Sequence, residues 1–155
     1  RNEEVEAMTD LATRIAAACP DEQAEWIERV WRLKNPEPTY VTVNALETVA
    51  TTERRAFKFG IYEQWAFAKQ RLDDTLAIAT PGAFLGAVVD MLPPSNEWTA
   101  WRIEEIRSRQ ARTAFVAELS RLSNNVSGAE DLCTGHGATP ALALLAAFCL
   151  AENLT

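Results

Sequence analysis

Apolar side chains recur at spacings of three and four residues along most of the chain, and this period is typical of amphipathic helices. The first such stripe predicts a helix from about Asn2 to Ala18, which Pro20 ends. A second helix begins near Asp21, whose carboxylate is suited to capping free backbone amides. The apolar side of this helix consists of Trp26, Ile27, Val30 and Trp31.

A pair of prolines interrupts the helical pattern in the segment Asn35-Pro36-Glu37-Pro38. Proline cannot continue a helix and holds the residue before it in extended geometry, so this segment is a firm boundary. Beyond it the sequence predicts a short extended piece at 40–43 and a short helix from Asn44 to Ala50. The longest apolar stripe then predicts a helix from about Glu53 to Ala79.

The dipeptide Thr-Pro occurs twice, at Thr80-Pro81 and Thr139-Pro140, and each copy precedes an apolar segment. Threonine caps a helix N-terminus, and proline is tolerated at the first helical position, where its missing N–H has no helical partner. We therefore expect helices over 82–92 and 141–151. Both are almost wholly apolar, which predicts that they lie near the centre of the fold, with the acidic first two helices outside. The flanks of the two Thr-Pro copies do not match, so the same capping solution used twice is favoured over an internal duplication.

The region between these two apolar segments predicts another long helix, from Ser95-Asn96-Glu97 through about Leu122, with Ser95 as its cap. Its hydrophobic set is Trp98, Trp101, Ile103, Ile106, Ala114, Phe115, Leu119 and Leu122. A short helix is expected within 126–132. The segment Gly135-His136-Gly137 is interpreted as a tight connection between helices, because glycine readily adopts positive φ.

These elements predict an all-α protein: one compact domain over residues 1–155, with six to eight helices in orthogonal or bundle-like packing. The predicted helical share is well above the roughly one third that is usual in globular proteins. The composition, with 48% hydrophobic and 24% charged residues, is that of a globular chain and not of a disordered one.

The net charge of −7 limits the classes of partner. Residues 1–37 carry −4, residues 38–112 are neutral, and residues 113–155 carry −3. A negative field of this kind argues against sequence-independent binding of nucleic acid, which needs clustered lysine and arginine residues that contact the phosphates. It favours a basic protein partner.

Hydropathy and cysteine content predict a soluble cytoplasmic protein. The continuous apolar stretch from Ala141 to Ala151 is too short to cross a bilayer, which needs about 20 residues. The N-terminus is acidic where a signal peptide would be basic. Three cysteines without framework spacing, namely Cys19, Cys133 and Cys149, favour a reducing compartment.

Few residues combine into recognisable chemistry. Cys133-x-x-His136, which contains the chain's single histidine, has the spacing of half a zinc site, but no further ligands stand nearby beyond Glu130 and Asp131. Glu22, Glu25 and Glu28 have the spacing of a magnesium-binding motif, which is also that of any solvated acidic helix face. The chain contains no phosphate-binding loop and no nucleophile elbow. We therefore expect no catalytic residue, no metal site and no cofactor.

A partner-binding role is predicted for four residues of the helix expected over 95–122: Trp98, Trp101, Arg102 and Arg109. Tryptophan and arginine are enriched at binding hot spots, although a core position of the two tryptophans explains the same pattern. The leading hypothesis is a non-enzymatic adaptor, regulator or inhibitor of a basic protein. One alternative is a metal- or anion-dependent enzyme or a small-ligand-binding domain. Another is a structural subunit that oligomerises through the helix bearing Trp98.

Overall fold

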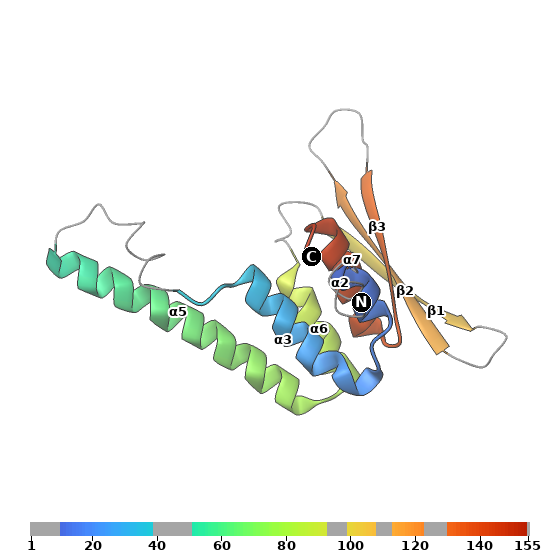
Figure 1. The fold of residues 1–155 in the computed structure, drawn as a ribbon, viewed down its shortest axis with the longest axis horizontal. Coiled ribbons are helices and arrows are strands. Elements are labelled where there is room, and N and C mark those ends of the chain that lie inside the picture. Colours follow the sequence, from blue (N-terminus) through green and yellow to red (C-terminus); the bar gives the residue numbers. More distant parts are fainter. Residues whose placement is uncertain (1–9, 39–50, 93–98, 108–112, 123–129, 155) are drawn as a thin grey trace, which may run out of the picture.

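The computed structural model describes residues 10–38, 51–92, 99–107, 113–122 and 130–154, and these form a mixed α/β fold (Figure 1). The elements in chain order are α2 (Leu11–Ala16), the 3-10 turn η1 (Pro20–Glu22), α3 (Gln23–Lys34), α5 (Thr51–Ile78), α6 (Pro81–Met91), β1 (Thr99–Arg107), β2 (Thr113–Leu122), β3 (Glu130–Gly137) and α7 (Pro140–Ala151). The prediction of an all-α protein with six to eight helices is therefore wrong.

Helix α7 lies at the centre of the described structure. The sheet covers one side of α7, and α2, α3 and α6 lie against its other sides (Figure 1). Every residue from Ala141 to Cys149 is buried, to 2% exposure or less. A helix that is apolar all round must be enclosed by protein, so the predicted central position of this segment is confirmed.

The two Thr-Pro helix starts have the predicted geometry. The Thr80 hydroxyl accepts the Ala83 N–H at 3.1 Å, and the Thr139 hydroxyl accepts the Leu142 N–H at 3.1 Å. In α6 only Ala87 and Val88 are fully buried, because this helix packs on α7 from one side. The prediction that this helix lies near the centre of the fold is therefore correct only for the face that packs on α7.

Three further predicted helices, which correspond to α2, α3 and α5, agree with the structure where their residues are described. Helix α3 buries Ile27, Val30 and Trp31 on its predicted apolar side. Helix α5 begins and ends within two residues of the predicted helix, and its C-terminal half packs on α3 and α6, whereas its N-terminal half extends away from the other described elements (Figure 1). The first predicted helix is described only from residue 10 onward, where α2 buries Leu11 and Ile15 against α7. The extended piece at 40–43 and the helix at 44–50 lie outside the described residues.

The predicted helix over 95–122 is instead an antiparallel pair of strands. Strands β1 and β2 pair along their length, with Ile103 opposite Ala117, and β2 pairs in turn with β3, with Ala117 opposite Gly135. The sheet order is β1-β2-β3. Residues 130–132, which the sequence pattern places in a short helix, belong to β3.

The error has a physical cause in the composition of this region. Segments 99–107 and 113–122 contain alanine, glutamate, arginine and leucine, which are strong helix formers. Strand preference depends on packing across a sheet more than on the isolated residue. Pairing with β3 and packing against α7 therefore favour strands over a helix in this region.

Gly135 and Gly137 are not a turn but two positions of β3 that face α7. A β-carbon on either residue would lie closer than 3.0 Å to backbone atoms of α7: those of Ala143 and Ala147 for Gly135, and those of Leu142 and Ala143 for Gly137. Neither glycine has a positive φ. The absence of a side chain thus allows the strand and helix backbones to touch.

Candidate interaction surface

Helix α7 covers one face of the sheet, and no element in the described ranges covers the other (Figure 1). Successive side chains of a strand point to opposite faces, so the register divides the sheet residues into two sets. The inner face, turned toward α7, carries the buried Ala117 and Leu119 together with the two glycines of β3. The opposite face, called here the outer sheet face, has no described element against it (Figure 1).

The outer sheet face has apolar ends and a charged middle. Its exposed residues are Ala100, Arg102, Glu104, Ile106, Leu132, Thr134 and His136. Leu132 is 56% exposed and Ile106 is 46% exposed, at diagonally opposite corners of the face. Between these corners Arg102 donates to the Glu118 carboxylate at 2.8 Å and lies 3.5 Å from the Glu104 carboxylate. One arginine and two glutamates leave this charged group with a net negative charge.

The four predicted partner-binding residues do not form one cluster. Trp101 and Arg102 are neighbours in β1 and therefore point to opposite faces of the sheet, whereas consecutive residues of a helix point only about 100° apart. Trp101 lies on the inner face but is 41% exposed, and β1 is the strand that packs least on α7. Trp98 and Arg109 lie outside the described residues.

Strand β1 forms an open edge of the sheet. It pairs with β2 on one side, and no described strand pairs with it on the other. Its charged side chains are well exposed: the exposed fractions are 64% for Arg102, 62% for Glu104 and 86% for Arg107. An edge strand of this length presents a row of unpaired backbone donors and acceptors to another chain.

The two candidate metal motifs differ in how the structure places their residues. Cys133 and His136 are three positions apart in β3 and therefore lie on opposite faces, so they cannot share an ion. The Glu28 carboxylate is held by Arg32 at 3.2 Å and by Lys69 of α5 at 3.1 Å. These bonds lower the pKa of Glu28, first through the hydrogen bond from Lys69. Glu28 is thus a link between α3 and α5.

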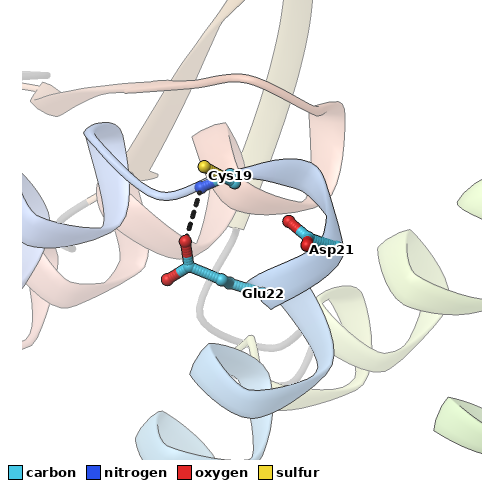
Figure 2. A group of neighbouring side chains, drawn as sticks. All are labelled: Cys19, Asp21 and Glu22. Atoms are coloured by element: carbon cyan, nitrogen blue, oxygen red, sulfur yellow. Dashed lines mark hydrogen bonds between the residues drawn. The ribbon is translucent and has the colours of Figure 1, made fainter.

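Among the described residues, one group of potential metal-ligand atoms lies within 4.8 Å, formed by Cys19, Asp21 and Glu22 at the start of η1. Figure 2 shows the Glu22 carboxylate turned toward the backbone of Cys19, whose N–H it accepts at 3.2 Å. This hydrogen bond caps the turn and lowers the pKa of Glu22. The grouping is therefore explained by capping of a helix start.

A cleft of about 310 Å³ lies among α3, α5 and α6. Trp31 and Leu72 contribute apolar walls, and Arg71 and Asp90 contribute one charge of each sign. The volume is at the lower end of the range of small-molecule sites. None of the carboxylates singled out from the sequence lines the cleft.

No known protein family matches the chain, and neither a curated protein nor a solved structure matches it. Within the described part of the chain, every helix is too short or too polar to span a bilayer. The functional argument therefore depends on the surfaces themselves.

Most residues of the outer sheet face are not identified by the sequence pattern. Ile106 belongs to the hydrophobic set of the helix expected over 95–122 and Leu132 to the expected short helix, and neither Glu104 nor Glu118 is a predicted binding residue. The signal that identifies these residues is an alternation of apolar and polar positions over Trp101-Arg102-Ile103-Glu104 and again over Ala117-Glu118-Leu119-Ser120. Each alternation is too short to outweigh the surrounding helix formers.

Proposed function

We propose that the chain is a protein-binding module, an adaptor, regulator or inhibitor, and that the outer sheet face holds its partner. The observation that carries this proposal is a sheet face that none of the described elements covers, with Leu132 and Ile106 exposed on it (Figure 1). Large exposed apolar side chains next to polar and charged ones mark protein contact surfaces. In most interfaces the apolar residues lie at the centre and the charged ones at the rim, whereas here a charged group separates two apolar corners. An antiparallel sheet tolerates a solvated face, but such a face is normally polar.

The charge of the chain favours a basic partner. The whole molecule carries −7, and the charged group on the outer sheet face contains two carboxylates and one guanidinium. Complementary charge accelerates encounter and disfavours like-charged competitors, and both effects weaken as salt screens the charges.

A capture experiment with matched variants tests this function. The full chain is immobilised, exposed to cell lysate at low salt, and washed with increasing salt. Leu132→Asp places a charge on the outer sheet face, whereas Ile78→Asp changes a residue of similar exposure, 62%, at the end of α5. We expect the wild type and Ile78→Asp to capture the same basic protein, and Leu132→Asp to lose it.

Two results contradict the proposed function. Capture that Leu132→Asp leaves intact assigns the contact to another surface, and capture that survives high salt removes the argument for a basic partner. Circular dichroism and thermal unfolding of each variant establish that any loss of capture occurs in folded protein.

The cleft among α3, α5 and α6 favours a second candidate function, the binding of a small ligand that carries both charges. Arg71 and Asp90 would hold its anionic and cationic groups in a cleft that Trp31 also lines. Thermal unfolding in the presence of free amino acids, which carry one group of each charge, tests this alternative. A rise in the melting temperature that Arg71→Ala abolishes supports it, and no rise with any of these compounds contradicts it.

A further inference from the structure

The open edge of β1 has an order of charges that complements itself. Its sequence from Thr99 to Arg107 is Thr-Ala-Trp-Arg-Ile-Glu-Glu-Ile-Arg. We propose that β1 pairs with β1 of a second copy of this chain, antiparallel and with Ile103 opposite Ile103, so that two three-stranded sheets join into one sheet of six strands. The backbone contact is made by the strand edge, and the β1 side chains Arg102, Glu104 and Ile106 next to it also belong to the outer sheet face, whereas Leu132 on β3 lies away from this edge.

The faces of the sheet limit the registers that such a pair can adopt. The helical layers of both copies stay on one side only if inner-face residues lie opposite inner-face residues. An antiparallel pair related by a two-fold axis must then be centred on a residue. The three registers that keep most of β1 paired are centred on Arg102, Ile103 and Glu104.

Charge distinguishes these three registers. A pair centred on Arg102 places two arginines opposite each other, and a pair centred on Glu104 places two glutamates opposite each other. A pair centred on Ile103 places Arg102 opposite Glu104 of the second copy, twice per dimer. Like charges directly opposite each other destabilise a strand pair and opposite charges stabilise it, so the Ile103 register is favoured.

The same register extends an ion pair that already exists within the chain. Arg102 donates to Glu118 of β2 at 2.8 Å. Glu104 of the second copy approaches Arg102 from the open side, which places one arginine between two carboxylates across three strands. On the outer sheet face Ala100 then lies opposite Ile106 of the second copy, which covers part of an exposed apolar side chain.

The junction between the two β1 strands is called here the seam. Contacts on its inner face account for the exposed indole of Trp101. In this register Trp101 lies opposite Glu105 of the second copy and diagonal to its Ile103 and Arg107. Diagonal neighbours are within reach of aromatic and long side chains. The second copy therefore supplies an apolar contact and a guanidinium to a ring that α7 leaves 41% exposed.

Two charge-reversal variants and their mixture test the register. Arg102→Glu places glutamates opposite each other in both halves of the seam, and Glu104→Arg places arginines opposite each other. When the two variants are mixed, the introduced glutamate faces the introduced arginine, and the native Glu104 of one variant faces the native Arg102 of the other. Each variant alone is expected to dimerise at least about tenfold more weakly than the wild type, and the mixture to recover 1:1 dimers.

The measurement is sedimentation velocity of the full chain over a concentration series. The wild type is expected to approach twice 17.2 kDa. Arg32→Glu is the matched control, because Arg32 is also exposed and paired with a carboxylate, but lies on α3. Glu104→Arg is the cleaner of the two variants, since Glu104 lies opposite the uncharged Val116 on β2.

Three results overturn the inference: a wild type that stays monomeric at the highest concentration, a dimer that both reversals leave intact, and a mixture of the two variants that does not associate. Each of these results leaves capture through Leu132 unaffected, so failure of the dimer is distinguishable from failure of the proposed function.

Discussion

The backbone of Gly135 in β3 lies directly against the backbone of Ala147 in α7, with no room for a β-carbon between them. This contact fixes the distance between the sheet and the central helix. It also explains why small residues recur on both sides of the contact, with Gly137 on the strand and Ala143 on the helix.

Gly135→Ala is therefore expected to lower the free energy of unfolding by about 3 kcal/mol, because the added methyl group forces strand and helix apart. Gly60→Ala is the matched control, since a β-carbon at Gly60 meets nothing within 4 Å and the residue lies within α5. The control should gain about 0.5–1 kcal/mol from improved helix propensity. Urea unfolding of both variants measures the two changes, and equal stability of both would contradict this account of the contact.

Gly135 also shows why part of the fold is predictable from the sequence and part is not. The Thr-Pro starts at Thr80 and Thr139 are local signals, because a cap and the amide that it accepts lie three residues apart. The sheet depends instead on contacts between segments distant in sequence. No local feature of Gly135 distinguishes close approach to a helix from a turn with positive φ.

The same distinction applies to the candidate surface. Residue type alone identifies Trp101 and Arg102, and the structure places both in an exposed strand. Their side chains point to opposite faces because consecutive residues of a strand alternate. A helical assignment does not predict this arrangement. Leu132 carries no signal of its own, because an exposed leucine is identified only once its neighbours in the sheet are known.

The thiols of Cys19 and Cys149 should differ sharply in reactivity. Burial within the core raises the pKa of Cys149 to about 12, so almost no thiolate is present at neutral pH. Cys19 is exposed to solvent, although its hydrogen bond with Glu22 also raises its pKa. Alkylation at pH 8 followed by peptide mass spectrometry should label Cys19 in the folded protein and Cys149 only after unfolding.

A variant of Glu22, which caps the turn at Cys19, tests the cause of the raised pKa of Cys19. Glu22→Gln removes the negative charge beside Cys19, so the pKa of Cys19 should fall and its labelling should accelerate. Labelling of Cys149 at the same rate as Cys19 in folded wild type would contradict the burial of α7.

The ion pair between Glu28 and Lys69 should give stability a specific pH dependence. The Lys69 ammonium lowers the pKa of Glu28 in the folded state. A lowered carboxyl pKa contributes stability above the carboxyl's ordinary pKa, and the contribution is lost as the pH falls through the folded-state value. Glu28→Gln should therefore be less stable than the wild type at neutral pH, and this difference should vanish in acid.

The size of this effect is limited by solvent, since the Glu28 side chain is 38% exposed. We expect less than about 1 kcal/mol for the pair. Thermal unfolding of wild type, Glu28→Gln, Lys69→Met and the double variant over a pH series isolates the coupling. A difference that grows toward acid would have the wrong sign for this account.

Hydrogen exchange at β1 tests the central claim, that residues 99–107 form an edge strand which a second copy completes. In an antiparallel edge strand every second amide points away from its neighbour. We predict that both sets of β1 amides are protected in the concentrated wild type, and that Arg102→Glu exposes the outward set alone. Residue-resolved exchange by nuclear magnetic resonance gives this pattern directly. Outward amides that exchange as fast in the wild type as in Arg102→Glu, or continuous helical protection across β1, would contradict the account.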